Sequence, residues 1–177
     1  MAVVVALIVA ALLHVFVVQS YFIPTPSMEP TLPVGARIVV DKLSYDLHGV
    51  HRGDIVVFTR PPNEHCAGSP VPDLVKRIVG LPGETISLSG NGHVLINGGR
   101  LEETWLPSRE QGTTYPGPSG PRYGLVRSYK IPANHYFVMG DNRSLSCDSR
   151  FWGPIAKSAI VGKVDLSIWP VSALHLF

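Results

Sequence analysis

The chain has little of what marks several common classes of protein. Its net charge is only +2 over 177 residues, which is too small to indicate nucleic acid as a partner. It has two cysteines and seven histidines, and no pair of them has the spacing of metal ligands. The histidines also fall in no recognisable catalytic triad, although histidine is the usual base for a serine nucleophile. We therefore expect no metal and no cofactor, and serine chemistry would need another base.

The sequence also lacks long amphipathic helices and internal repeats, and it has no second apolar run of membrane-spanning length besides the N-terminal one described below. Short runs rich in β-branched residues, separated by glycine and proline, indicate strands instead. The expected strands are residues 37–42, 55–59, 74–79, 85–88, 93–96, 136–139 and 160–169. Residues at about 100–130 are rich in Gly, Pro and Ser, and we expect them to form a long irregular surface excursion. The fold class we expect is mainly β, with antiparallel sheets around a compact core and one N-terminal transmembrane helix.

Lysine and arginine are absent before Arg37, and residues 2–18 are apolar with one exception. A run of this length is at the lower end for a membrane-spanning helix, and Tyr21-Phe22-Ile23 extends it with an aromatic boundary. A cleaved signal peptide is the alternative. It would begin with a charge and end in small residues, and Val18-Gln19-Ser20-Tyr21 is a poor site of that kind. The sequence therefore favours a retained anchor.

Charge does not set the orientation of this anchor. All fifteen lysines and arginines follow the span, which by the positive-inside rule alone would place the large domain in the cytoplasm. Long domains, however, translocate largely regardless of their charge. We expect a transmembrane anchor at residues 2–20 and one β domain at residues 21–177, with its side of the membrane open at this point.

A serine held between prolines follows the anchor, in Pro24-Thr25-Pro26-Ser27-Met28-Glu29-Pro30. The prolines fix their own φ angles and push the residues before them toward extended conformations, so the approach to Ser27 is stiff. A stiff loop suits a preorganised nucleophile. It also suits a plain juxtamembrane linker, and this segment alone does not decide between the two.

Lys76 is a candidate for the missing base. Lysine can take a proton from serine only if its amine is neutral near pH 7, and burial can lower its pKa that far. In a strand at residues 74–79, Lys76 shares a face with Leu74 and Ile78, whereas Arg77 points the other way and can find an acidic partner. The alternative is an edge-strand lysine whose ammonium group lies in water.

Polar residues concentrate in one loop after a strand, from Gly140-Asp141-Asn142-Arg143 to Asp148-Ser149-Arg150. By itself this pattern favours a turn with a surface ion pair. The two cysteines, Cys66 and Cys147, could form one disulfide in an oxidising compartment. Two unpaired thiols are the alternative, because the sequence does not give their distance in space.

Four segments together resemble bacterial type I signal peptidases (leader peptidases), which are serine–lysine endopeptidases. The segments are Ser27-Met28-x-Pro30-Thr31-Leu32, Gly53-Asp54-Ile55-Val56-Val57-Phe58, Lys76-Arg77-x-Val79-Gly80-x-Pro82-Gly83-Glu84 and the loop from Gly140 to Arg150. One of them alone would be weak, but four in the family's order after an N-terminal span are specific. The resemblance implies a membrane-bound enzyme that removes signal peptides from exported preproteins after small-x-small sites such as Ala-x-Ala.

The resemblance also implies roles for individual residues. Ser27 matches the nucleophile, Lys76 the general base, and Ser146 the serine that orients the lysine amine by a hydrogen bond. Thr25 falls where many relatives have a serine, and its hydroxyl would join the backbone N–H of Ser27 in the oxyanion hole. The residues matched to supporting roles are Ser146, Asp148, Arg150 and Arg77.

Shallow apolar pockets for the substrate would be lined by Ile23, Met28, Leu32, Leu74 and Val75. A disulfide between Cys66 and Cys147 would tie down the loop that carries Ser146. The partners implied are signal-peptide-bearing preproteins, the lipid bilayer and the secretion translocon, and no nucleic acid. The domain would lie on the outer face of the bacterial cytoplasmic membrane, with a single-pass anchor.

Two other functions share part of this pattern. A self-cleaving repressor or a conjugation-type peptidase uses the same serine–lysine chemistry, but the span and the lack of a DNA-binding segment argue against the repressor. A non-catalytic, membrane-tethered β domain that binds exported chains is the rival from another class. Intact Ser27, Lys76 and Ser146 argue against it.

Overall fold

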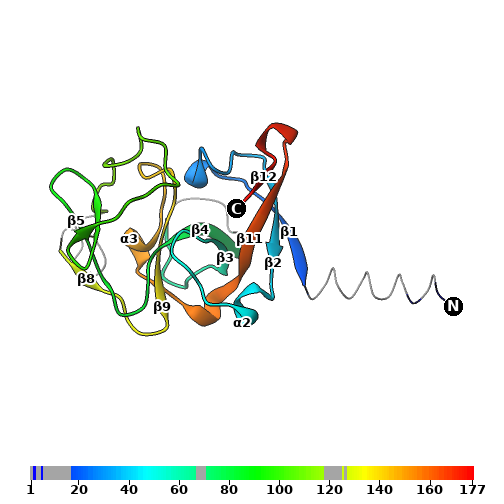
Figure 1. Cartoon of the computed structure of the whole chain (residues 1–177), viewed down its shortest axis with the longest axis horizontal. Helices are drawn as coiled ribbons and strands as arrows, with labels where there is room; N and C mark the ends of the chain where they lie inside the picture. The colour runs from blue at the N-terminus through cyan, green and yellow to red at the C-terminus, as the bar shows by residue number, and fades with distance from the viewer. Residues whose placement is uncertain (1, 3–4, 6–16, 67–70, 118–124, 126) are drawn as a thin grey trace.

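The structure, a computed structural model, describes residues 2, 5, 17–66, 71–117, 125 and 127–177. These residues form two antiparallel sheets, which lie next to each other in Figure 1. The larger sheet has the order β1-β2-β11-β3-β4-β9-β10, with β12 paired to β11, and the smaller has the order β7-β6-β5-β8. The strands of the larger sheet are β1 (Val18–Phe22), β2 (Arg37–Asp41), β3 (Ile55–Thr59), β4 (Asp73–Gly80), β9 (His135–Met139), β10 (Ile155–Ala156), β11 (Ile160–Trp169) and β12 (His175–Leu176). Those of the smaller sheet are β5 (Thr85–Leu88), β6 (Val94–Ile96), β7 (Gly99–Arg100) and β8 (Tyr129–Lys130).

The mainly antiparallel β fold is therefore confirmed. The ranges predicted for β3, β5 and β11 agree with the structure at both ends. Turns with glycine or proline bound β3 and β5, and Pro170 follows β11. The strands that the sequence did not predict are short or lie at sheet edges: β1, β7, β8, β10 and β12. Four of them, β7, β8, β10 and β12, have only two residues each, which is too few for an alternating pattern. The fifth, β1, lies at the edge of the larger sheet.

Helices in the described part of the chain are single turns. They are α2 (Ser44–Leu47), α3 (Ser149–Trp152) and the 3-10 turns η1 (Pro26–Met28), η2 (Lys157–Ala159) and η3 (Val171–Ala173). None of the helices among the described residues has the length and apolar character needed to cross a bilayer.

The predicted anchor at residues 2–20 lies mostly outside the described residues, at 3–4 and 6–16. Its C-terminal boundary is corrected, because Val18–Phe22 form β1 and pair with all of β2 from Arg37 to Asp41. Val18-Gln19-Ser20 thus belongs to the sheet. In an edge strand outside the bilayer, water can satisfy the backbone groups that the one neighbouring strand leaves unpaired, so a polar stretch such as Gln19-Ser20 is better placed there than in a bilayer.

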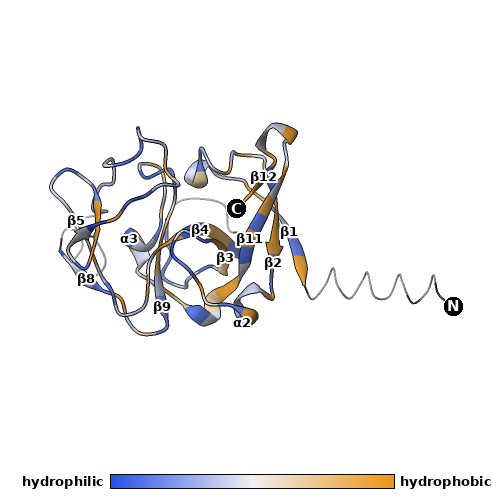
Figure 2. Cartoon of the chain, viewed as in Figure 1, coloured by the Kyte–Doolittle hydropathy of each residue, from blue (hydrophilic) through white to orange (hydrophobic). Residues whose placement is uncertain are grey.

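Buried apolar residues gather in three clusters around the strands. One lies under β1, β2, β3 and β11 and includes Met28 and Leu32, which follow the first turn of the domain. A second includes Phe58 of β3 and Ile78 of β4. The third joins the end of β4 and strand β9 to the smaller sheet, which thereby docks against the larger one. Figure 2 shows hydrophobic residues along β1, β2 and β4, where this packing is centred.

The segment between β7 and β8 corrects the prediction of a surface excursion. The residues described there form no helix or strand, but Glu103, Leu106, Thr114 and Leu125 are buried. Glu103 and Thr114 are buried because both accept hydrogen bonds from the guanidinium of Arg143. The segment therefore covers the polar loop that follows β9, while residues 118–124 and 126 lie outside the described part.

Candidate active site

Ser27 lies in the 3-10 turn η1, which begins at Pro26. Proline suits the first position of such a turn because its φ angle is fixed and its missing N–H would be unpaired there. Met28, the next residue, is buried in the core, and its carbonyl accepts from Leu32 N at 2.9 Å. This packing holds the backbone of Ser27 while its side chain faces the centre of the larger sheet.

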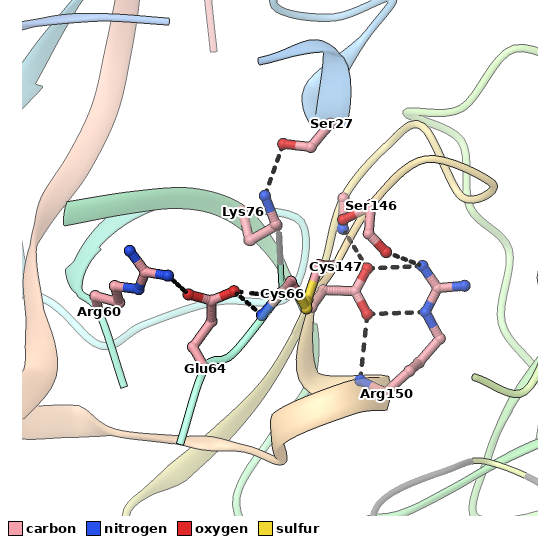
Figure 3. The surroundings of a disulfide bond; sticks show 10 residues. Ser27, Arg60, Glu64, Cys66, Lys76, Ser146, Cys147 and Arg150 are labelled. Atoms are coloured by element: carbon pink, nitrogen blue, oxygen red, sulfur yellow. Dashed lines mark hydrogen bonds and ion pairs between the residues drawn. A yellow bond between two sulfur atoms is a disulfide. The ribbon is translucent and has the colours of Figure 1, made fainter. Parts of the chain in front are cut away.

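Lys76 extends from β4, a strand hydrogen-bonded on both sides by β3 and β9. It is therefore no edge-strand lysine, and only 4% of its surface is exposed. Its Nζ donates to Ser27 Oγ at 2.7 Å (Figure 3). It also donates to the carbonyl of Val75 at 3.0 Å. Ser27 and Lys76 are 49 positions apart in sequence, so the fold alone brings them together.

Burial lowers the pKa of Lys76 from 10.5 to about 8. The cause is that a charged ammonium loses its hydration inside the protein. The carboxylates of Asp148, Asp141 and Glu64 act in the opposite direction but are outweighed, and the charge of Arg150 lowers the pKa further. The amine therefore has a substantial neutral fraction near pH 8, which is what a general base for serine requires.

The loop after β9 holds the serine turn in place through Asp141. Arg77, next to Lys76 on β4, donates to both oxygens of Asp141 at 2.8 and 2.6 Å. Thr31 Oγ1 donates to the same carboxylate at 2.5 Å, and Asn142 N donates to the carbonyl of Ser27 at 3.2 Å. Arg77 thus finds the acidic partner that the sequence let us expect: it is Asp141, in a buried ion pair.

A second buried ion pair, Asp148–Arg150, shapes the other half of this loop. Arg150 donates to Asp148 through Nε and Nη2, both at 2.8 Å, and Gly140 N donates to it at 3.0 Å. Burial alone would raise the pKa of Asp148, but the charge and hydrogen bonds of Arg150 hold that pKa below its ordinary value. Nη2 of Arg150 also donates to the carbonyl of Ser146 at 3.2 Å, so the pair fixes the backbone at Ser146.

The hydrogen bond predicted from Ser146 to Lys76 is not formed. Ser146 is buried beside the dyad, but the amine of Lys76 donates to Ser27 and to Val75 instead. Gly140 lies between the two serines: a Cβ there would come within 2.2 Å of Ser146 Oγ and 2.3 Å of the Ser27 carbonyl oxygen. Ser146 therefore packs against the loop backbone, and an orienting role for its hydroxyl stays a prediction.

Thr25 precedes the turn and places its Oγ1 3.3 Å from Ser27 Oγ. A hydroxyl at this distance can donate toward an oxygen that develops negative charge next to the nucleophile. Its predicted place in an oxyanion hole, with the backbone N–H of Ser27, stays a prediction.

An apolar pocket of about 180 Å³ opens beside Ser27 and Lys76. Four of the five residues predicted to bind substrate line it: Ile23, Met28, Leu74 and Val75. Leu32, the fifth, does not. It is fully buried in the cluster under β1, β2, β3 and β11, so the sequence pattern placed a core residue in the pocket.

Cys66 and Cys147 are joined in a disulfide, with their Cα atoms 6.3 Å apart (Figure 3). Glu64 lies beside it, accepts from Cys66 N at 2.9 Å and forms an ion pair with Arg60. Glu64, Cys66 and Cys147 are grouped closely enough to be metal ligands. The disulfide, however, leaves neither cysteine as the thiolate that binds metals.

Several residues of this site had no role in the sequence prediction. Thr31 belongs to the recognised Ser27 segment, but its partner Asp141 lies 110 positions away. Arg60 and Glu64 pair four positions apart in sequence, and nothing in that spacing relates the pair to the dyad. Arg143 was part of the recognised loop, but its buried partner Glu103 lies 40 positions earlier in an irregular segment. Only the three-dimensional structure relates such residues to the dyad.

The family model described as signal peptidase, peptidase S26, matches residues 1–169 of the chain. The chain belongs to this family of signal peptidases. Signal peptidase I of Leptolyngbya laminosa is 38% identical over 171 residues, which cover 96% of this chain and 77% of the relative. Signal peptidase I of Bacillus caldolyticus is 37% identical over 168 residues, covering 94% and 87% of the two chains. A solved signal peptidase I from Enterococcus faecalis V583 is 26% identical, covers 66% of this chain and 97% of its own, and has a TM-score of 0.46.

Membership of the signal peptidase family gives the Ser27–Lys76 contact a chemical context. A buried lysine amine 2.7 Å from a serine hydroxyl, with a pKa near 8, is an arrangement that can activate the hydroxyl for attack on a peptide bond. It needs neither a histidine nor a metal ion.

Proposed function

We propose that the chain is a membrane-bound serine endopeptidase that removes signal peptides from exported preproteins. Its membership of the signal peptidase family supports the reaction and the substrate class. The observation that carries the proposal is the buried hydrogen bond between Lys76 Nζ and Ser27 Oγ, in which the base is held at the nucleophile before any substrate arrives.

The reaction begins when Ser27 Oγ attacks the carbonyl carbon of the scissile bond. Neutral Lys76 takes the hydroxyl proton, and the backbone N–H of Ser27 and the hydroxyl of Thr25 donate to the oxyanion. Protonated Lys76 then gives its proton to the leaving amine as the C–N bond breaks, which leaves an ester on Ser27. Lys76 then takes a proton from water, which attacks the ester carbonyl; as the bond to Ser27 breaks, Lys76 returns this proton to Ser27 Oγ, and the signal peptide leaves with a free carboxylate.

The apolar pocket supports cleavage after small residues. At about 180 Å³ it is small and lined by Ile23, Met28 and Val75, so an alanine side chain fits beside the nucleophile. In this proposal the substrate lies extended between the strand end at Ile23 and residues 71–75, and adds main-chain hydrogen bonds to them. An anchor ending near Val17 and a domain on the outer face of the cytoplasmic membrane complete the proposal.

The test is cleavage of a preprotein with an Ala-x-Ala site in detergent, followed by sequencing of the new N-terminus. We expect one cut after the second alanine, and loss of that cut when this alanine is replaced by phenylalanine. The Ser27→Ala variant should cut neither substrate. Binding of the preprotein without any cut, by a wild-type chain shown to be folded, would instead support the non-catalytic binding domain.

A further inference from the structure

A second pocket adjoins the apolar pocket at the dyad. Both pockets contact Ser27, Lys76 and Thr25, but the second one continues toward the disulfide. Its volume is about 230 Å³. We call it the charged pocket, because the ion pair between Arg60 and Glu64 lies in its wall. Its residues beyond those shared with the apolar pocket are Pro26, Arg60, Glu64, Cys66, Leu145 and Cys147.

A third pocket, of about 620 Å³, adjoins the charged pocket. Cys66, Cys147 and Leu145 line both, so the disulfide and this leucine form a ridge between them. We call the third one the distal pocket. Its further residues are Asn63, His65, Tyr115, Ser144, Ser146, Phe151 and Trp152.

Two features of this ridge and the distal pocket suit an extended peptide. Leu145, in the loop that follows β9, is 66% exposed and presents apolar surface on the ridge. Trp152 is buried in the wall of the distal pocket, and its Nε1 has no acceptor among the described residues. A buried N–H without an acceptor is costly, and a carbonyl of a bound peptide would satisfy it.

We infer that the charged and distal pockets bind the first residues of the mature protein, on the far side of the scissile bond. This inference rests on the proposed function. The apolar pocket is lined by Tyr21, Phe22 and Ile23, which continue from the N-terminal apolar run, so it takes the signal-peptide side of the substrate. The part of the substrate beyond the scissile bond leaves Ser27 in the other direction, enters the charged pocket and crosses the Leu145 ridge.

The charged pocket sets the chemistry that this segment meets first. The side chain of Glu64 is 7% exposed, whereas that of its partner Arg60 is 26% exposed, so the substrate meets the guanidinium. Beyond the ridge, Tyr115, Phe151 and Trp152 offer aromatic surface. At about 3.3 Å per residue, the first two residues beyond the scissile bond extend roughly 7 Å and the first six roughly 20 Å, so we place the shorter segment in the charged pocket and the end of the longer one in the distal pocket.

The first experiment compares two peptides with the same Ala-x-Ala half. One ends two residues after the scissile bond and the other continues to six residues, including a leucine at the fourth. We expect kcat/KM of the long peptide to exceed that of the short one at least tenfold. Equal values would overturn the inference while leaving the proposed function intact. If neither peptide is cut, the proposed function fails and the inference fails with it.

The second experiment places a charge on the ridge. In Leu145→Asp the ratio of long-peptide to short-peptide kcat/KM should fall below about threefold, because the aspartate disfavours an apolar segment crossing the ridge. Because both peptides are cut by the same variant, any effect of the substitution on the chemical step cancels in the ratio of their kcat/KM values. Leu47→Asp is the matched control, since Leu47 is 75% exposed on α2 and lines none of the three pockets; its ratio should equal that of the wild type. An unchanged ratio in Leu145→Asp would overturn the inference.

Discussion

Raising the pH from 7 to 9 should increase the rate of cleavage through one group, the amine of Lys76. Its folded-state pKa of about 8 lies below the ordinary value of 10.5, so the neutral form that accepts the serine proton is a minority at pH 7. From that pKa, roughly 10% of the amine is neutral at pH 7, about half at pH 8 and roughly 90% at pH 9. The expected gain in kcat/KM between pH 7 and pH 9 is therefore about tenfold.

Substitution of a carboxylate near Lys76 should shift the pH dependence of kcat/KM. Asp148, Asp141 and Glu64 each raise the pKa of Lys76, and burial outweighs them. Removing the charge of Glu64 in Glu64→Gln should therefore move the acid limb of the profile to lower pH, and raise the relative activity at pH 7. The neutral amide keeps an oxygen that can accept from Cys66 N.

The assay is kcat/KM for an Ala-x-Ala peptide between pH 5.5 and 10, with unfolding followed at each pH. A single acid limb with a midpoint near 8 supports Lys76 as the base. A limb centred near 6.5 would point to a histidine. A flat profile from pH 6 to pH 9 would refute the reasoning, because no group with a pKa near 8 would then control the reaction.

Three further predictions concern packing and stability. Gly140→Ala should lower kcat at least 100-fold, because its Cβ would overlap the Ser27 carbonyl and Ser146 Oγ; Gly90→Ala, with open space around it, is the control. Reducing the Cys66–Cys147 disulfide, which spans 81 residues, should lower the free energy of unfolding by about 2–5 kcal/mol in denaturant titrations. Lys76→Met should abolish cleavage yet raise the free energy of unfolding at pH 7 by up to about 3 kcal/mol, because the buried amine is largely protonated there.

The sign of the last effect follows from linkage. Lys76 has a lower pKa folded than unfolded, so its contribution to stability is complete above pH 10.5 and is lost as the pH falls to about 8. The advantage of Lys76→Met should therefore shrink above pH 8 and vanish near pH 10.5. A Lys76→Met variant less stable than the wild type at pH 7 would contradict the account of its buried charge. Full activity of Gly140→Ala, or an unchanged unfolding midpoint after verified reduction, would contradict the other two.

The pairing of Ser27 with Lys76 was expected from the resemblance of four ordered segments to one family, because neither segment alone decided its own role. Prolines around Ser27 and apolar neighbours of Lys76 are visible in the sequence, and their order along the chain resembled one family. The long central strands could be predicted from local signals, since β3 and β11 carry enough β-branched residues between turns to be read directly.

What the sequence could not supply were contacts between distant segments. Leu32 and Met28 are both apolar, close in sequence and buried in the same cluster, and only the structure shows that Met28 also lines the pocket whereas Leu32 does not. The burial of Glu103 depends on Arg143, 40 positions away. The hydrogen bond expected from Ser146 failed because the position of an amine within a few ångströms depends on the whole loop, not on residue type.

The most direct test of the central claim measures cleavage of one Ala-x-Ala preprotein by the wild type, Ser27→Ala, Lys76→Ala and the double variant, each shown to be folded. If Ser27 and Lys76 act as one unit, both single variants and the double variant should fall to the same residual rate, at least 10⁴-fold below the wild type by the precedent of other catalytic units. Turnover within tenfold of the wild type in either single variant would contradict the claim, as would a double variant much slower than both.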